Sequence, residues 1–205
     1  MNAGRPKDLE KRRRILEAAK CLFLACGYHG CSMNRIAQQA DVSKLTVYNH
    51  FQDKETLFTS AIAETCDRLL QARPIQLSAG SDFQQALLQA CELSLNIVNL
   101  PEALKTEYLL LELASQRNPL AQQFYNASHE KLSALWESFF AQAAALRFIR
   151  ADAPHRQTLL IFSLLLGLRH HEVLMGIRPA PDQAERAGII QDSIELFLLR
   201  YGRSE

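Results

Sequence analysis

Apolar side chains recur at helical spacing along almost the whole chain, and this pattern constrains the fold more than any other feature. In residues 9–26 they fall at positions i, i+4, i+7, i+8 and i+11, which line up on one face of a helix. The same template returns in residues 181–201. The sequence shows neither a useful length of strand-like alternation nor an internal repeat. The chain is therefore predicted to be all-α, with about nine helices.

Prolines, one glycine and capping residues divide this pattern into segments. Pro101, Pro119, Pro154 and Pro181 each stand where the first turn of a helix tolerates proline. Gly27 is placed to end the first helix, and Ser32, Ser43 and Asp53 are placed to cap the next three. The predicted helices are 9–26, 32–40, 44–51, one that starts after residue 53, 82–99, 101–117, 119–147, 154–175 and 181–201.

The composition excludes a mainly disordered chain and argues against a membrane protein. Of the 205 residues, 48% are hydrophobic, which is enough apolar surface to offset the entropy lost on folding. The most apolar stretch, residues 158–168, is shorter than the roughly 20 residues that cross a bilayer. The polar N-terminus shows no secretory signal. We therefore expect a cytoplasmic protein with no membrane partner and with its five cysteines reduced.

Charge is distributed unevenly along the chain. Residues 1–60 carry ten Lys and Arg against six Asp and Glu, whereas residues 61–205 carry thirteen against sixteen. This charge gradient is typical of a basic module that binds a polyanion and is attached to a larger acidic body. A solubilising basic tail gives it equally well.

Two short predicted helices, residues 32–40 and 44–51, have the spacing of a helix-turn-helix. In that motif the second helix enters the major groove of DNA and the first crosses the backbone. At 100° per residue, Val47 and Phe51 face inward, while Leu45, Thr46 and Asn49 face roughly the opposite way. An ordinary helical hairpin with a solvated face has the same spacing, so spacing alone leaves both readings open.

The stretch GYHGCSMNRIAQQADVSKLTVYNHFQDKETLF resembles the N-terminal domain of TetR-family transcriptional repressors. Its Gly-Tyr, Ile-Ala, Val-Ser-Lys, Tyr-x-His-Phe and Lys-Glu-x-Leu-Phe submotifs keep the family's spacing over about residues 10–58. The resemblance implies a DNA-binding domain over residues 1–54 and a helical ligand-binding and dimerisation domain over residues 55–205. Position 45, usually Gly or Pro in the family, is Leu here, and position 31, often Thr, is Cys.

The resemblance also implies which residues meet DNA. Leu45 would either touch a thymine methyl group in the major groove or crowd the groove. The residues that match the family's base and phosphate contacts are Met33, Asn34, Ser43, Lys44, Leu45, Thr46, Tyr48, Asn49, His50 and Lys54.

The first residues of the chain resemble an arm that enters the minor groove. Arg5 and Lys7 flank Pro6 in a Gly-Arg-Pro-Lys sequence, and arginine is attracted to a narrow A·T-rich minor groove. A cationic tail that is attracted only to phosphates has the same sequence. We therefore include Arg5 and Lys7 among the expected DNA contacts and leave both modes open.

Metal and catalytic sites are not expected. Cys21 and Cys26 point about 140° apart on a helix, and no CxxC pair accompanies them or Cys31. Packing as small hydrophobic side chains explains these cysteines better than metal binding does. Cys31 nevertheless lies close enough to the helix-turn-helix motif to sense redox state there. HExxH, GxSxG, Walker and GxGxxG patterns are all missing from the sequence. We expect no enzyme activity, no metal and no cofactor.

In the resembling family an apolar ligand cavity lies among the middle helices, and the last two helices pair with their copies. Ordinary core packing, or a polar pocket lining for His170, is the alternative for each candidate ligand residue. The expected ligand-binding residues are Tyr108, Phe124, Trp136, Phe140 and His170. The expected dimer residues, on apolar stripes of the last two segments, are Leu159, Phe162, Leu166, Ile190, Ile194, Phe197 and Tyr201.

Together these features predict a homodimeric, ligand-responsive regulator, most simply a repressor. It would bind a palindromic operator in double-stranded DNA and be released by a small, largely apolar effector. Two alternatives are a helical enzyme and an architectural protein that uses the helix-turn-helix without a ligand. The missing catalytic motifs and the family resemblance argue against the enzyme.

Overall fold

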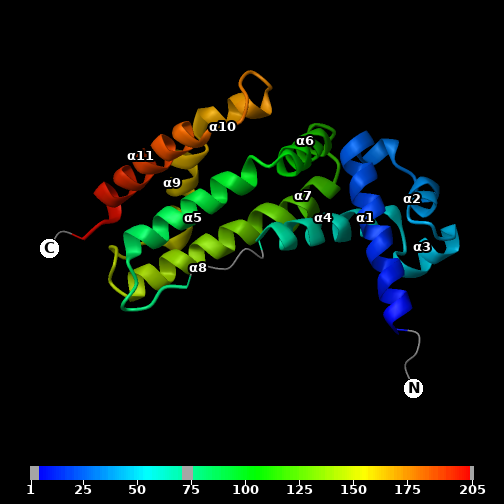
Figure 1. The fold of residues 1–205 in the computed structure, drawn as a ribbon, viewed down its shortest axis with the longest axis horizontal. Helices are drawn as coiled ribbons and strands as arrows, with labels where there is room; N and C mark the ends of the chain where they lie inside the picture. Colours follow the sequence, from blue (N-terminus) through cyan, green and yellow to red (C-terminus); the bar gives the residue numbers. More distant parts are fainter. Residues whose placement is uncertain (1–4, 71–75, 204–205) are drawn as a thin grey trace. The chain divides into compact units, whose positions relative to one another are not determined.

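The computed structural model describes residues 5–70 and 76–203, and within these ranges the side chains of residues 5–7, 66 and 68–70 are not described. Regular structure in the described part is helical, apart from one isolated bridge between Ile149 and Gly202. This confirms the all-α prediction. In chain order (Figure 1) the helices are α1 (Arg5–Gly30), α2 (Met33–Gln39), α3 (Lys44–His50), α4 (Lys54–Leu70), α5 (Phe83–Val98), α6 (Pro101–Ser115), α7 (Leu120–Tyr125), the π-helix η1 (Asn126–Glu130), α8 (Lys131–Ala145), α9 (Pro154–Leu165), α10 (Gly167–Leu174) and α11 (Gln183–Tyr201).

The chain divides into two compact units. Unit 1 comprises Met1–Gln71 and Lys105–His129, and unit 2 comprises Ala72–Leu104 and Glu130–Glu205. The family resemblance implies a domain boundary after residue 54, whereas unit 1 also includes α4 and α7. These two helices pack with each other, and α4 packs with α1. Phe58 of α4 lies 5.0 Å from Phe23 of α1 and 5.7 Å from Phe124 of α7, measured between ring centroids. All three rings are fully buried, so α4 and α7 share one apolar core with α1.

Unit 2 has a core rich in aromatic rings. Its helix α9 contacts both α8 and α11, and α11 contacts α5 (Figure 1). Phe140 of α8 stacks on Phe197 of α11 at a centroid distance of 4.8 Å, and Trp136 lies 5.4 Å from Phe140. Offset aromatic pairs of this kind stabilise a core beyond the area they bury.

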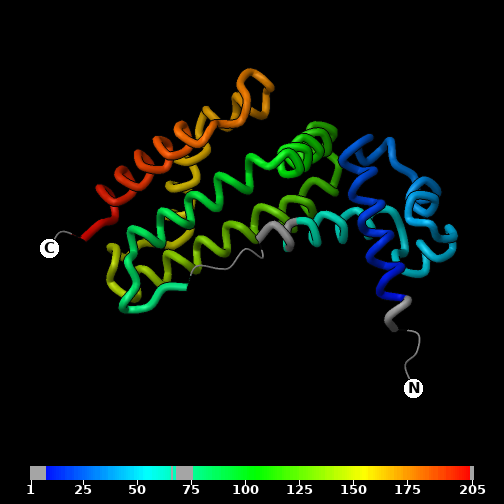
Figure 2. Tube along the Cα trace, viewed as in Figure 1, coloured from blue at the N-terminus to red at the C-terminus, as the bar shows by residue number. Residues whose placement is uncertain are grey.

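Two segments predicted as single α-helices depart from that prediction in different ways, and Figure 2 traces the chain through both of them. The segment 119–147 contains the π-helix η1, where the Ser128 hydroxyl donates to the carbonyl of Phe124 at 2.8 Å. The segment 154–175 breaks at Gly167, whose φ of +43° suits a residue without a Cβ. Gly27 is predicted to end the first helix, but α1 continues to Gly30 and is kinked at Gly27, where φ is +73°.

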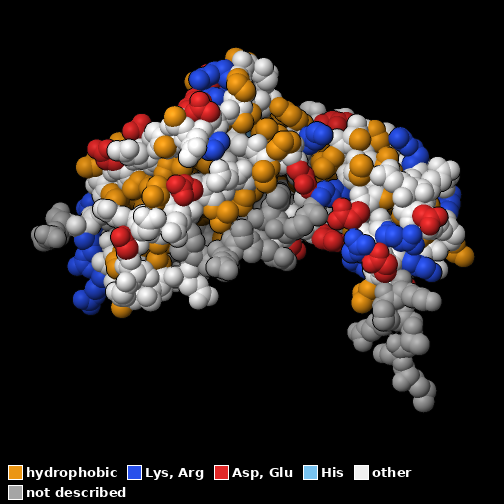
Figure 3. All heavy atoms as spheres, in the orientation of Figure 1, with side chains coloured by type: hydrophobic (Ala, Val, Ile, Leu, Met, Phe, Trp, Pro, Cys, Tyr) orange, Lys and Arg blue, Asp and Glu red, His pale blue; other side chains and the backbone are white. Residues whose placement is uncertain are grey.

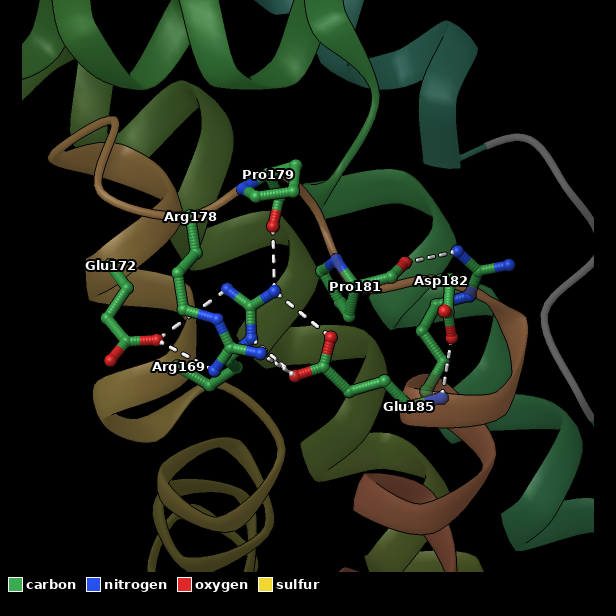
Figure 4. Close-up of polar contacts among 8 residues, drawn as sticks. Arg169, Glu172, Arg178, Pro179, Pro181, Asp182 and Glu185 are labelled. Atoms are coloured by element: carbon green, nitrogen blue, oxygen red, sulfur yellow. Dashed lines mark hydrogen bonds and ion pairs between the residues drawn. The ribbon is translucent and has the colours of Figure 1, made fainter.

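An arginine-centred network holds the turn between α10 and α11 (Figure 4). The Arg169 guanidinium donates to both carboxylate oxygens of Glu185, at 2.7 and 3.1 Å, and to the Pro179 carbonyl at 2.7 Å. Arg178 pairs with Glu172 at 3.3 Å and with Glu185 at 3.0 Å. Because the two arginines share one carboxylate, the network fixes the path of this turn.

A helix that crosses a bilayer needs about 20 consecutive apolar residues. Among the described residues, no helix is long and apolar enough to do so.

Candidate nucleic-acid interface

The helix α3 presents a mixed polar and apolar surface over a fully apolar back. Ser43 caps its N-terminus by accepting a hydrogen bond from the Thr46 amide at 3.0 Å. Val47 and Phe51 are buried in unit 1, as the helical angles predict. Leu45 has 69% of its surface exposed. The outward face of α3 is therefore available to a partner.

Most residues expected to meet DNA lie on this accessible surface of unit 1. Met33 is the exception, because it is only 7% exposed and belongs to the apolar core. The side chains of Arg5 and Lys7 lie outside the described residues. The exposed members are Asn34, Ser43, Lys44, Leu45, Tyr48 and Asn49, and the partly buried members are Thr46, Lys54 and His50, whose side chain is only 11% exposed.

Two lysines of this surface are positioned over aromatic rings. The Lys54 ammonium lies 4.2 Å from the centroid of Tyr28, and the Lys44 ammonium lies 5.8 Å from that of Tyr48. Lys54 begins α4, which Asp53 caps by accepting from the Thr56 amide at 2.7 Å. That hydrogen bond also holds the pKa of the Asp53 carboxyl below its usual value. Lys54 thus stands at a capped helix N-terminus, where its charge and the helix dipole both favour a phosphate.

Contacts from α1 hold the C-terminal end of α3, and the sequence pattern did not reveal them. His50 Nε2 lies 3.2 Å from Asp8 Oδ1, and the Arg12 guanidinium lies 5.0 Å from the Phe51 ring centroid. These pairs join residues about 40 positions apart, so local periodicity carries no signal for them. They anchor α3 to α1.

The cysteines and nearby ligating groups offer no described metal site. Among the described residues no group of three His, Cys, Asp or Glu side chains is arranged to hold a metal ion. Burial raises the pKa of the Cys31 thiol to about 11 and that of Cys91 to about 12. Both thiols are therefore protonated at neutral pH, and Cys31 lacks the thiolate character that redox sensors need.

The five expected ligand-binding residues divide between the units. Tyr108, which is exposed, and Phe124, which is buried, belong to unit 1, whereas the other three belong to unit 2. Trp136 and Phe140 are buried in the aromatic core, and the Trp136 indole donates to Ser94 Oγ at 3.0 Å. His170, the third expected ligand-binding residue of unit 2, is half-buried.

The expected dimer residues also separate into two groups. Ile190, Phe197 and Tyr201 are buried in the core of unit 2, so their side chains are not available to a second copy of the chain. Phe162, Leu166 and Ile194 are half-buried against that core, and Leu159 is exposed. On α11 the exposed apolar side chains are instead Leu196 and Leu199, which the sequence pattern did not single out.

Family comparisons cover most of the chain. A family of bacterial regulatory proteins, the tetR family, matches residues 15–61, and the C-terminal domain of AefR-like transcriptional repressors matches residues 85–203. The transcriptional regulator UidR of Escherichia coli is 30% identical over 88% of this chain and 87% of its own.

Other relatives differ in the direction of regulation that their names state. The transcriptional activator FasR of Mycolicibacterium smegmatis is 36% identical over 42% of this chain, and the transcriptional repressor KstR of the same organism is 26% identical over 68%. These matches span 39% of FasR and 66% of KstR.

Two solved structures have the same fold. A TetR-family regulator from Mesorhizobium loti has a TM-score of 0.84 at 28% identity, covering 96% of this chain and 99% of its own. A flavonoid-responsive regulator, FrrA, has a TM-score of 0.82 at 26% identity, covering 95% and 98%.

Proposed function

The chain belongs to the TetR family of bacterial transcriptional regulators, and on that premise we propose that it is a repressor. It binds a palindromic operator as a homodimer in the cytoplasm, and a small, largely apolar effector releases it. The observation that carries the proposal is the exposed face of α3, where Lys44, Leu45 and Asn49 surround a buried apolar back. Family membership supports DNA binding, while the repressor mode, the dimer and the effector are parts of our proposal.

Residues of the α3 face have different roles in this proposal. Asn49 reads a base edge, because an amide can bond two groups of adenine at once. Leu45 meets a thymine methyl group. Lys44, Tyr48, His50 and Lys54 meet phosphates, which position the protein without reading sequence. The capped start of α4 supports that role for Lys54.

Selection of a binding site from random DNA tests this assignment. Tyr48→Ala should weaken binding to all selected sites, whereas Asn49→Ala should change the preferred base, with about 1–3 kcal/mol less discrimination at one position. Binding should also fall with salt at a log–log slope of about −0.9 per phosphate contacted. Wild-type affinity and preference in the double variant would contradict the role of α3. Transcription in vitro from the selected site then distinguishes repression from activation.

The proposed dimer uses α9 and α11 of unit 2. Support comes from exposed leucines that have no role within one chain: Leu159 on α9 and Leu196 and Leu199 on α11. These leucines lie on two helices that contact each other, and apolar side chains that gather on one exposed face often mark a protein interface. Two copies would place their α3 helices in successive major grooves, about 34–36 Å apart.

The proposed effector site lies among the aromatic rings of unit 2. Trp136 is the only tryptophan of the chain, and its indole donates to the buried Ser94 hydroxyl. The name of FrrA states that it responds to flavonoids, which are aromatic compounds with hydroxyl groups. A ligand of that class would suit a site of aromatic rings with one polar group. Release of DNA requires different ligand affinities for the two states, and about 3 kcal/mol gives about 150-fold release.

Fluorescence of Trp136 gives a direct test of this site. Flavonoids and other apolar aromatic compounds should quench its emission at the concentrations that release operator DNA. Trp136→Phe should bind operator DNA normally and respond at higher concentrations of the same compounds. Release of DNA without any change in Trp136 emission would place the effector elsewhere.

A further inference from the structure

Arginine side chains gather at one end of unit 2, and the proposed function gives them no role. Unit 2 contains ten Lys and Arg against twelve Asp and Glu, so it is acidic as a whole. Figure 3 shows Lys and Arg side chains grouped beside the C-terminal end of the chain. We call the exposed residues Arg147, Arg150, Arg200 and Arg203 the arginine end.

Backbone pairing brings these four residues together. Ile149 and Gly202 form an antiparallel bridge, and the Arg150 amide donates to the Tyr201 carbonyl at 2.7 Å. The segment that leaves α8 therefore lies directly against the segment that leaves α11. Two arginines follow α8 and two lie at the end of α11, so the pairing concentrates four positive charges.

Some of these side chains close helix ends and keep most of their hydrogen-bond donors. Arg150 Nη2 donates to the Arg200 carbonyl at 2.6 Å, and Arg203 Nη1 donates to the Arg147 carbonyl at 3.4 Å. Such contacts satisfy carbonyls that a helix C-terminus leaves unpaired. A guanidinium has five N–H donors. Capping therefore explains where Arg150 and Arg203 lie, but it leaves donors on every member of the arginine end.

The charge of Arg200 reaches one described carboxylate, that of Asp152, whose pKa is lowered chiefly by the hydrogen bond from the Ala153 amide and least by Arg200. Among the described residues, none of the four makes an ion pair within 4.0 Å. Asp152 lies nearby, but it accepts from the Tyr201 hydroxyl at 3.0 Å and pairs with Arg156 at 3.5 Å. Clustered like charges repel each other. An anionic partner would remove that repulsion.

We propose that the arginine end binds the phosphate backbone of a second DNA segment while the α3 helices hold the operator. The inference rests on the proposed function, because that function brings the protein to DNA. Duplex DNA carries one negative charge per about 1.7 Å of its axis, so its phosphates are spaced closely enough to meet all four guanidinium groups. All four residues are arginines, whose planar fork bonds two phosphate oxygens together. The contact would be independent of sequence and would let one regulator join two stretches of duplex.

The test uses the full-length protein saturated with unlabelled operator duplex. A labelled duplex of unrelated sequence is then added, and its fluorescence anisotropy is followed from 50 to 200 mM salt. Four phosphate contacts give a log–log slope of about −3.6, so the wild-type protein should lose about 150-fold in affinity for the second duplex. Arg147→Gln with Arg200→Gln should reduce the slope by about 2. These two side chains make no capping bond to the helix ends, so the fold should persist.

Control variants separate this site from general charge. Lys105→Gln with Arg117→Gln removes two exposed charges from unit 1 and should leave binding of the second duplex unchanged. Arg147→Lys with Arg200→Lys should keep the salt slope and weaken binding at every salt concentration.

The outcomes distinguish this inference from the proposed function. No operator binding would contradict the proposed function, whereas operator binding without a second duplex would overturn only the arginine end. Binding of phosphatidylserine vesicles in place of DNA would also overturn it. Residues 204–205 lie outside the described residues, so a variant that ends at Arg203 is included. If only that shortened variant binds a second duplex, the chain's own C-terminus occupies the arginines and the proposal is wrong.

Discussion

Gln123 of α7 donates from Nε2 to the carboxylate of Glu55 on α4 at 2.8 Å. Its carbonyl oxygen accepts from the Thr59 hydroxyl, one helical turn further along α4, at 3.0 Å. One amide therefore contacts two successive turns of α4. Glu55 is also the neighbour of Lys54, the proposed phosphate contact, so α7 is tied to the part of α4 closest to the DNA surface.

The first prediction concerns the energy of this contact. Glu55→Ala and Gln123→Ala should each destabilise unit 1 slightly, and a double-mutant cycle in urea should give a coupling of about 0.5–1 kcal/mol. The value is small because both side chains are exposed. Gln122→Ala, a change in the adjacent residue of α7, is the matched control and should show no coupling to Glu55. Additive effects in the first cycle would mean that the contact contributes nothing.

The second prediction concerns the cap of α4. The pKa of the Asp53 carboxyl is lowered by the Thr56 amide, so its charged form is favoured in the folded state. Such a group stabilises the protein above its unfolded pKa, about 3.9, and the contribution disappears as pH falls through the lower folded value. Asp53→Ala should therefore lower the urea midpoint at pH 7, and its difference from the wild type should shrink as the pH falls below the unfolded pKa of about 3.9. Asp53→Ser keeps a capping oxygen and should lose less at pH 7.

The third prediction concerns thiol reactivity. Burial raises the pKa of Cys31 to about 11, while Cys21 is exposed on α1. At pH 8, iodoacetamide should alkylate Cys21 in the native protein and leave Cys31 unmodified until urea unfolds unit 1. Mass spectrometry of the peptides measures both sites. Rapid native modification of Cys31 would restore the possibility that it senses redox state.

Local signals in the sequence predicted the N-terminal motif well. Ser32 and Ser43 cap α2 and α3, and Val47 and Phe51 are buried, because caps and helical angles depend only on neighbouring residues. The contact of Asp8 with His50 was not predictable in this way, since it depends on how α1 and α3 pack. The break at Gly167 was also missed, because its surroundings are apolar at helical spacing and a single glycine is tolerated within a helix.

Helix α11 shows where periodicity fails for function. The sequence places apolar residues on more than one side of this helix, and period alone does not tell which side meets the rest of the chain. The structure packs Phe197 on Phe140 and leaves Leu199 71% exposed. Phe197, which the sequence assigns to the dimer, is therefore a core residue. Leu196 and Leu199, which are exposed on the same helix, were not among the expected dimer residues.

The last prediction separates these two roles within one helix. Phe197→Asp places a charge in an apolar core, which costs far more than unit 2 can offset, so circular dichroism should show an unfolded or aggregated protein. Leu199→Asp changes an exposed side chain, so the helical signal and the urea midpoint should stay close to those of the wild type.

Sedimentation at micromolar concentration should show a dimer for the wild type and a monomer for Leu199→Asp. That monomer should bind a single half-site weakly and lose the palindromic operator, because one chain supplies only one reading helix. Leu45→Asp, an equal change in another exposed leucine, is the control and should remain dimeric. A folded, dimeric Leu199→Asp protein with full operator affinity would show that this face of α11 does not hold two copies together.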